Sequence, residues 1–214
     1  MRKPATEISR GPIAAFASRA KQRIEKLLGY RRGDWLRERQ VEDWMTFLKA
    51  RSISSLRCLE ISPAPQTPWA KLGFQEYTST RFPEFDICVM CLDSSFDVVI
   101  ADQVLEHVVD PVEAVRNCKR MLTEGGWLLV AAPFLFRVHG RPRDFTRWTA
   151  DGLSQLFVKA GFSADAVVAR SWGNRACARA HIGSSRVLPY GFWRPMQNED
   201  EYPVMSWAFG QNRT

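Results

Sequence analysis

Two histidines stand near acidic residues at positions where side chains could move a proton. His107 follows Asp102 by five positions, and His139 precedes Asp144 by five. The ordinary pKa of histidine is about 6.5, so a neutral imidazole can accept a proton from a hydroxyl or ammonium group. We therefore predict that His139 and Asp144 are catalytic, with His139 as the base. The alternative is that His139 only braces its loop by bonding to Asp144. For His107, a binding or structural role is favoured over that of a base.

Arginines cluster around His139 and again in the last quarter of the chain, where residues 166–198 include no acidic residue. Guanidinium groups bind phosphate and carboxylate, so we predict an anionic ligand in contact with Arg143, Arg147 and Trp148. Two alternatives stay open: the arginines are solvated surface residues, or Arg147 forms an ion pair with Asp144 that shapes the loop. The two runs are Arg137, Arg141, Arg143 and Arg147, and then Arg170, Arg175, Arg179, Arg186 and Arg194.

The five cysteines suggest no metal or disulfide. Cys88 and Cys91 have the spacing of a metal-binding pair, but no second pair and no histidine lies near them in the sequence,. The cysteines are odd in number and mostly embedded in apolar runs, and no export signal is recognised. We expect reduced, buried thiols in a cytoplasmic protein, and no bound metal.

These candidate residues follow strands in an alternating pattern of strands and helices. Strands are predicted at 56–61, 74–79, 85–90, 96–101 and 127–132, with further candidates at 166–169 and 204–209,. One helix is expected after the Asp110 cap and another from 150 to 160, ended by Gly161. Continuously apolar strands between helices require a parallel sheet covered on both faces. Ligands bind such sheets beyond the carboxyl ends of the strands, here after Ile61, Ala101 and Ala132.

Several motifs follow one another along the chain: Leu105-Glu106-His107, Gly125-Gly126, Pro133-Phe134, His139, Asp144 and Arg147-Trp148-Thr149. Their order and spacing resemble the class I S-adenosylmethionine-dependent methyltransferases, in the methyltransferase type 11-like branch. The resemblance covers residues 56–170 and is most specific from 96 to 161. It implies an α/β, Rossmann-like, seven-stranded sheet of order 3-2-1-4-5-7-6, mostly parallel with an antiparallel last strand. It also implies methyl transfer from S-adenosylmethionine to a small molecule or saccharide.

The cofactor-binding residues implied by the resemblance include departures from the family pattern. The first loop, 60–72, contains three prolines and no glycine, and Thr80 and Arg81 stand where an acidic residue usually holds the ribose,. Either this loop binds cofactor through backbone groups and Asp102, or the domain has weakened or lost cofactor binding and serves as a partner or regulator. His107 is expected one to two turns into the helix after the fourth strand. The assigned residues are Glu60, Ile61, Ser62, Asp86, Asp102, Gln103 and His107.

The net excess of positive charge is confined to the start of the chain. The net charge is +7, yet residues 1–33 hold nine basic and two acidic residues, so the remainder balances at 21 of each. We predict a basic helical arm or lid over 1–54, with helices at 13–28 and 35–48, followed by a methyltransferase domain over 55–214. Arginines spread around amphipathic helices argue against nucleic acid as partner, although an RNA methyltransferase is an alternative. The longest apolar run, 127–136, is about half of a membrane span.

Overall fold

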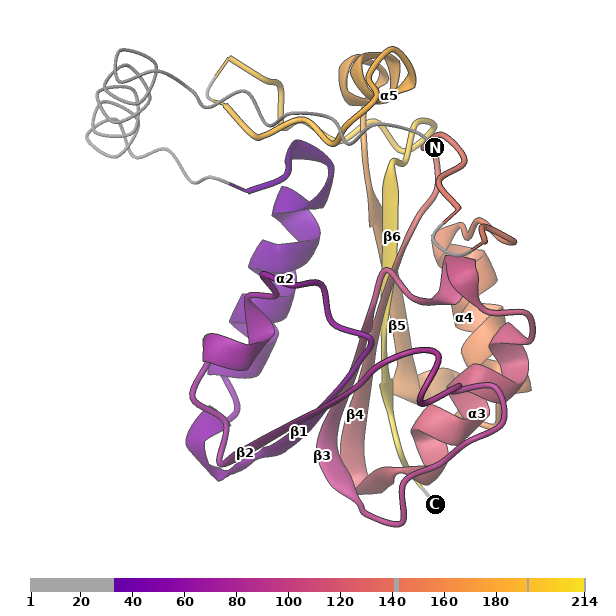
Figure 1. Cartoon of the computed structure of the whole chain (residues 1–214). Coiled ribbons are helices and arrows are strands. Elements are labelled where there is room, and N and C mark those ends of the chain that lie inside the picture. Colours follow the sequence, from indigo (N-terminus) through magenta and orange to yellow (C-terminus); the bar gives the residue numbers. More distant parts are fainter. Residues whose placement is uncertain (1–32, 141–142, 192, 214) are drawn as a thin grey trace, which may run out of the picture.

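A computed structural model of the chain describes residues 33–140, 143–191 and 193–213 (Figure 1). The helix predicted at 13–28 and the side chain of Arg141 lie outside these residues. The described chain forms a six-stranded mixed sheet of order β2-β1-β3-β4-β6-β5. Strand β6 runs antiparallel to both β4 and β5, and the other neighbouring strands are parallel. The strands are β1 (Arg57–Ile61), β2 (Glu76–Thr80), β3 (Phe96–Asp102), β4 (Leu122–Pro133), β5 (Val167–Trp172) and β6 (Met205–Gln211).

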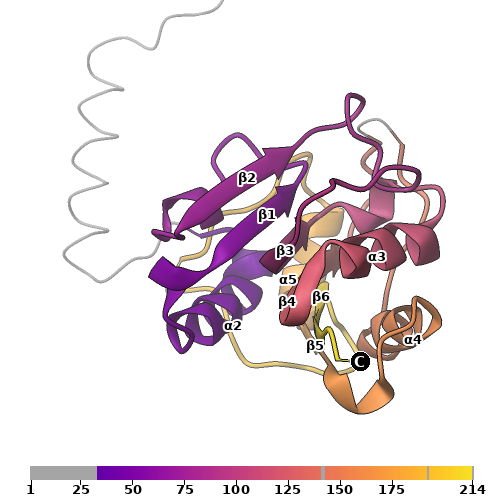
Figure 2. The same ribbon diagram turned by 90° about the horizontal axis from the view of Figure 1, so that it is seen from below.

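Helices cover both faces of the sheet, as Figures 1 and 2 show. One layer holds α3 (Pro111–Arg120) and α4 (Ala150–Lys159); the other holds α2 (Glu38–Lys49) and α5 (Arg175–Ile182). Alternate residues of β3 enter the two layers: Val99 and Ala101 pack toward α3 and α4, and Val98 and Ile100 toward α2,. Burial on both faces explains why β3 and β4 are apolar throughout. Among the described residues, no helix is long and apolar enough to cross a bilayer.

Five short 3-10 turns complete the described chain. Two of them, η3 and η4, follow the carboxyl ends of β1 and β3 and help to shape that edge of the sheet. The helix predicted around His107 is one of these turns, and His107 is its last residue, so the expected depth of one to two helical turns is wrong. Val108 leaves the turn in an extended conformation. The turns are η1 (Trp35–Arg37), η2 (Ile53–Ser55), η3 (Trp69–Lys71), η4 (Leu105–His107) and η5 (Ala164–Ala166).

The strand predicted at 85–90 is wrong. These residues form turns: the Asp86 carboxylate accepts a hydrogen bond from the backbone N–H of Cys88 at 2.9 Å, and the Asp86 carbonyl accepts from Met90 at 2.9 Å. Phe85 and Ile87 are buried in the core, which explains their apolar character without a strand. The sheet therefore has six strands rather than seven, and its order is the expected one with the third strand removed.

Helix α3 begins at the predicted cap. The Asp110 carboxylate accepts a hydrogen bond from the backbone N–H of Glu113 at 3.0 Å, and Pro111 occupies the first helical position. The Glu113 carboxylate pairs with Arg116 and Arg120 instead of closing a capping box. The cap fixes where the chain turns from η4 into the helix.

Replacing the cap, in Asp110→Ala, is expected to lower the free energy of unfolding by about 1 kcal/mol, because one N-terminal N–H loses its acceptor. Urea denaturation measures this difference. The matched control is Asp151→Ala, an exposed acidic residue in the first turn of α4, where Thr149 provides the cap. The control should change stability by less than about 0.5 kcal/mol. Equal losses in the two variants would contradict the capping role.

Candidate functional site

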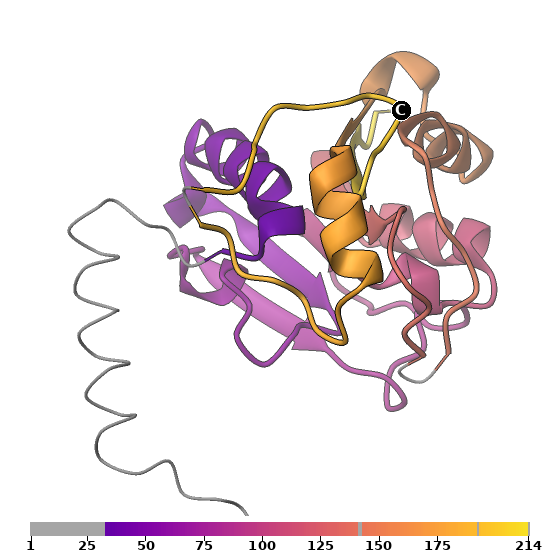
Figure 3. The ribbon, with the colours of Figure 1, turned by 90° about the horizontal axis from the view of Figure 1, so that it is seen from above.

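The candidate site lies where β1, β3 and β4 finish, at the carboxyl edge of the sheet. Figure 3 looks onto this end of the molecule, with α5 in front of the sheet. Three acidic side chains gather on β1, β3 and η4 at this edge, and all of them are almost wholly buried. The exposed fraction is 2% for Glu60, 0% for Glu106 and 6% for the side chain of Asp102. Buried carboxyl groups need donors or cations, so the partners of each one define what the edge can bind.

Glu60 is held by hydroxyl groups of the chain. Its carboxylate accepts hydrogen bonds from the Tyr77 hydroxyl at 2.6 Å and from Thr67 Oγ1 at 2.8 Å. Burial nevertheless raises the pKa of Glu60 above its usual value, with the two hydroxyls opposing that shift. Thr67 belongs to the glycine-free loop, so this hydrogen bond ties the loop to the end of β1. The carboxylate thus has an internal structural role, and its assignment to cofactor binding stays a prediction.

Asp102 joins the start of the described chain to the sheet. Its Oδ2 atom forms an ion pair with the Arg37 guanidinium and accepts a hydrogen bond from Trp69 Nε1 at 2.9 Å. Its Oδ1 atom is buried and has no hydrogen-bond partner among the described residues. Sequence patterns gave no sign of Arg37 or Trp69, which lie 65 and 33 positions away. Asp102 therefore retains one acceptor that a ligand could use.

The residues that follow β1 and β3 share an uncommon backbone conformation. Ser62 has φ of 48° and Gln103 has φ of 61°, in the left-handed region that few non-glycine residues adopt,. The Gln103 backbone N–H donates to the Ala131 carbonyl at 2.8 Å, and its side-chain amide contacts Met205 Sδ. Strain of this kind concentrates at binding and active sites, which supports the placement of a site at this edge.

Glu106, His107 and His139 form a second cluster beside Asp144. The Nε2 atoms of His107 and His139 each lie 3.8 Å from Glu106 Oε1. Neither carboxylate oxygen of Glu106 has a hydrogen-bond partner in the described part of the chain. Burial raises the pKa of Glu106 to about 8. Glu106 was not assigned a role from the sequence, although it stands between Leu105 and His107 in a motif; its burial without a partner is visible only in the structure.

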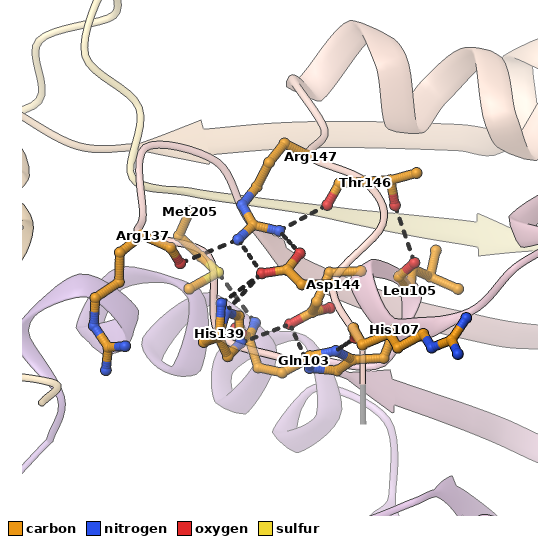
Figure 4. Close-up of polar contacts among 11 residues, drawn as sticks. Gln103, Leu105, His107, Arg137, His139, Asp144, Thr146, Arg147 and Met205 are labelled. Carbon is orange, nitrogen blue, oxygen red and sulfur yellow. Dashed lines mark hydrogen bonds and ion pairs between the residues drawn. The ribbon is translucent and has the colours of Figure 1, made fainter. Parts of the chain in front are cut away.

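Asp144 is the centre of the loop that carries His139 (Figure 4). The Arg147 guanidinium grips both Asp144 oxygens, with Nη2 to Oδ2 at 2.5 Å, and this pairing lowers the pKa of Asp144 to about 2. Asp144 Oδ2 also accepts from the His139 backbone N–H at 2.8 Å and lies 3.1 Å from His139 Nδ1. Arg147 donates in addition to the carbonyls of Arg137 and Thr146. These contacts support the interpretation that the Asp144–Arg147 ion pair shapes the loop.

The other predicted site residues differ in burial and in their contacts. Ile61 is buried in the core, Asp86 caps its own turn, and the exposed Arg143 uses its backbone carbonyl to bind His107 Nδ1 at 2.5 Å. The Trp148 indole packs against the core beside α4, and its Nε1 atom is buried without a partner among the described residues. The structure thus brings His107, His139, Asp144 and the carbonyl of Arg143 together and leaves Asp86 in its own turn.

Comparisons with known proteins agree with this fold. A family model described as a methyltransferase domain matches residues 43–130. A protein of Mycobacterium tuberculosis named "Probable S-adenosylmethionine-dependent methyltransferase" is 33% identical over 98 residues, covering 40% of this chain and 36% of the relative. A ubiquinone biosynthesis O-methyltransferase of Albidiferax ferrireducens is 32% identical over 97 residues, covering 45% of this chain and 32% of that protein. The chain thus spans about a third of the length of these curated relatives.

Two solved structures share the fold at low sequence identity. A proposed sarcosine dimethylglycine methyltransferase from Galdieria sulphuraria aligns with a TM-score of 0.53 and 11% identity, over 81% of this chain and 86% of that one. A phosphoethanolamine N-methyltransferase from Haemonchus contortus aligns with a TM-score of 0.53 and 12% identity, over 81% of this chain and 53% of that one. They support the α/β, Rossmann-like architecture with helices on both faces.

The raised pKa of Glu60 predicts a pH effect on stability. A carboxyl group whose pKa is higher in the folded than in the unfolded chain contributes most below its usual value of 4.5, and that contribution is lost as the pH rises through the raised value,. In Glu60→Gln, the free energy of unfolding should therefore fall less between pH 5 and pH 8 than in the unaltered chain. The control Glu76→Gln, on the exposed face of β2, should keep the original dependence. Equal slopes for Glu60→Gln and the unaltered chain in urea denaturation would contradict the prediction.

Proposed function

Because the chain belongs to the class I S-adenosylmethionine-dependent methyltransferases, we propose that it transfers a methyl group from S-adenosylmethionine to a hydroxyl group of a small molecule or saccharide. The observation that carries the proposal is the placement of Asp102 beside the Glu106, His107 and His139 cluster at the carboxyl edge of the sheet. In an open parallel sheet, this edge is where ligands bind. The O-methyltransferase named among the relatives supports a hydroxyl acceptor.

The carboxyl edge offers unpaired polar atoms that fit the cofactor. Asp102 Oδ1 and Thr80 Oγ1 are buried and have no partner among the described residues, and they belong to the last residues of β3 and β2, the strands on either side of β1. Asp102 would accept from the ammonium group of the cofactor, and Thr80, in place of the usual acidic residue, would face its ribose hydroxyls. Ser62 and Gln103 would contribute backbone groups beside them. The bound cofactor supplies a methyl group on a positively charged sulfur, which an acceptor oxygen attacks in line.

His139 is the proposed base. Burial lowers the pKa of His139, which keeps the imidazole neutral and able to accept a proton near neutral pH. Asp144, charged because Arg147 holds it, lies 3.1 Å from Nδ1 without a hydrogen bond to it, and its charge would stabilise the imidazolium that forms on proton transfer. Nε2 is then the atom that would take the proton from the acceptor hydroxyl. The backbone N–H of His139 braces the loop by donating to Asp144, and this contact leaves Nε2 available, so the two interpretations of His139 are compatible.

The acceptor is proposed to be a small anionic molecule. Arg143 is exposed beside the cluster, so its guanidinium is available to a phosphate or carboxylate,. Arg147 differs: both of its Nη atoms are engaged with Asp144 and backbone carbonyls. We therefore assign acceptor charge recognition to Arg143 and a positioning role to Arg147, which acts through Asp144.

Cofactor binding is the first test. Calorimetric titration with S-adenosylmethionine should show one site per chain, and Asp102→Ala should weaken binding by about tenfold or more, because a charged hydrogen bond is lost. The matched control is Asp93→Asn, an exposed acidic residue before β3, which should bind like the unaltered chain. No binding at millimolar cofactor would overturn the proposal and favour a regulatory domain in which Arg37 and Trp69 occupy Asp102 permanently.

Proton transfer is the second test. With an acceptor found by screening hydroxyl compounds with labelled methyl donor, His139→Gln should lower kcat by about 10²- to 10⁴-fold while cofactor affinity stays unchanged. Arg143→Gln should instead raise the acceptor KM with little effect on kcat. Full activity in His139→Gln would rule out the base.

A further inference from the structure

Glu106, His107 and His139 present three possible metal-ligand atoms to one point. One carboxylate oxygen and one imidazole nitrogen of each histidine all lie within 4.8 Å of one another. The His107 and His139 ring centroids are 5.0 Å apart, and the ring planes meet at 73° (Figure 4). An ion bound 2.0–2.2 Å from each ligand separates such atoms by roughly 3 to 4 Å. The 3.8 Å separations in the cluster are of this size.

The burial of Glu106 without a hydrogen-bond partner independently favours a cation-binding site. Its side chain is fully buried, and neither oxygen has a partner in the described residues. Glu60 and Asp102, the other acidic groups of the edge, both have donors of the chain itself. A buried carboxyl group with no donor is costly, and a cation between Glu106 and the two imidazoles would remove that cost.

The outer contact of His107 matches that of metal-binding histidines. His107 Nδ1–H donates to the Arg143 carbonyl at 2.5 Å, whereas His139 Nδ1 lies 3.1 Å from the Asp144 carboxylate without a hydrogen bond among the described residues. Metal-binding histidines usually direct their second nitrogen to a carbonyl or carboxylate in this way, which fixes the ring and the tautomer. Both Nε2 atoms are thereby left facing Glu106.

We propose that Glu106, His107 and His139 bind one divalent transition-metal ion of the Zn²⁺ class. Two imidazoles and one carboxylate form a ligand set that Zn²⁺ accepts, with a fourth position open to water or substrate. This differs from the expectation of no metal, which rested on the isolated Cys88 and Cys91 pair. The use of this site rests on the proposed function: the acceptor hydroxyl would take the open position, where the ion would lower its pKa and its proton would leave to solvent. The oxygen would then take the methyl group as the methyl–sulfur bond breaks and S-adenosylhomocysteine leaves. In the metal-bound chain His139 would be a ligand, so the base role proposed above belongs to the metal-free chain.

Metal binding can be measured on the full chain without cofactor or acceptor. Metal-free protein is titrated with Zn²⁺ by calorimetry, and with Co²⁺ by visible absorption, which reports the coordination sphere. We expect one equivalent bound, loss of at least about 100-fold in affinity in Glu106→Gln, and loss of about 10- to 100-fold in Asp144→Asn through its contact with His139. The matched control Cys88→Ser/Cys91→Ser should bind like the unaltered chain.

The outcomes separate this site from the others. Unchanged affinity in Glu106→Gln, loss of binding in the cysteine variant, or no binding at millimolar Zn²⁺ would each overturn the proposal. Thermal unfolding shows whether Glu106→Gln is folded: removal of a buried acid should leave its Tm equal or higher, and added Zn²⁺ should raise the Tm of the unaltered chain only. A Tm of Glu106→Gln that rises with Zn²⁺ as in the unaltered chain would also count against the site. The metal titration is done without S-adenosylmethionine. A negative result would therefore overturn the metal site without bearing on the proposed cofactor binding.

Discussion

The burial of three carboxyl groups at one edge of the sheet is the constraint on which the rest of the structure depends. Each group raises the electrostatic cost of its neighbours: Asp102 contributes to the raised pKa of both Glu60 and Glu106. The side chains that contact each carboxyl group are of a different kind. Two hydroxyls hold Glu60, a guanidinium and an indole hold Asp102, and Glu106 is left facing two imidazoles. Glu60 thus has hydrogen-bond donors for its carboxylate, Asp102 has donors for one oxygen only, and Glu106 has none among the described residues. A bound ligand or ion would therefore stabilise the edge most at Glu106.

The residues before β1 take part in this edge as well as in the core. Trp44 and Leu48 of α2 are fully buried against the sheet, and the Trp44 and Trp69 rings pack 5.2 Å apart. Arg37 extends from the turn before α2 to Asp102. The described part of the predicted arm is thus packed as closely as the strands, while its role as a lid and the boundary at residue 54 stay predictions. Any ligand group that binds Asp102 meets Arg37, which couples the site to this helix.

How far the sequence predicts this protein depends on how local each feature is. Strands β3 and β4 and the cap of α3 follow from short patterns, because β-branched runs and an Asp before Pro act within a few residues,. The strand expected at 85–90 failed for the same local reason: Asp86 lies between Phe85 and Ile87 in an alternating pattern, but its carboxylate closes a turn. Motif order located both histidines. Arg37 and the unpartnered state of Glu106 could not be foreseen, since tertiary packing alone creates them.

The missing third strand has a consequence for how the molecule meets its neighbours. It leaves β2 as the outermost strand on its side of the described sheet, and an outer strand offers unpaired backbone groups onto which another chain can add,. β2 is only five residues long, and four of them are polar. Glu76, at its start, carries an exposed charge that pairs with Arg57 of β1. A short, hydrophilic outer strand of this kind disfavours the addition of a strand from another molecule. The six-stranded sheet therefore resists aggregation through this edge.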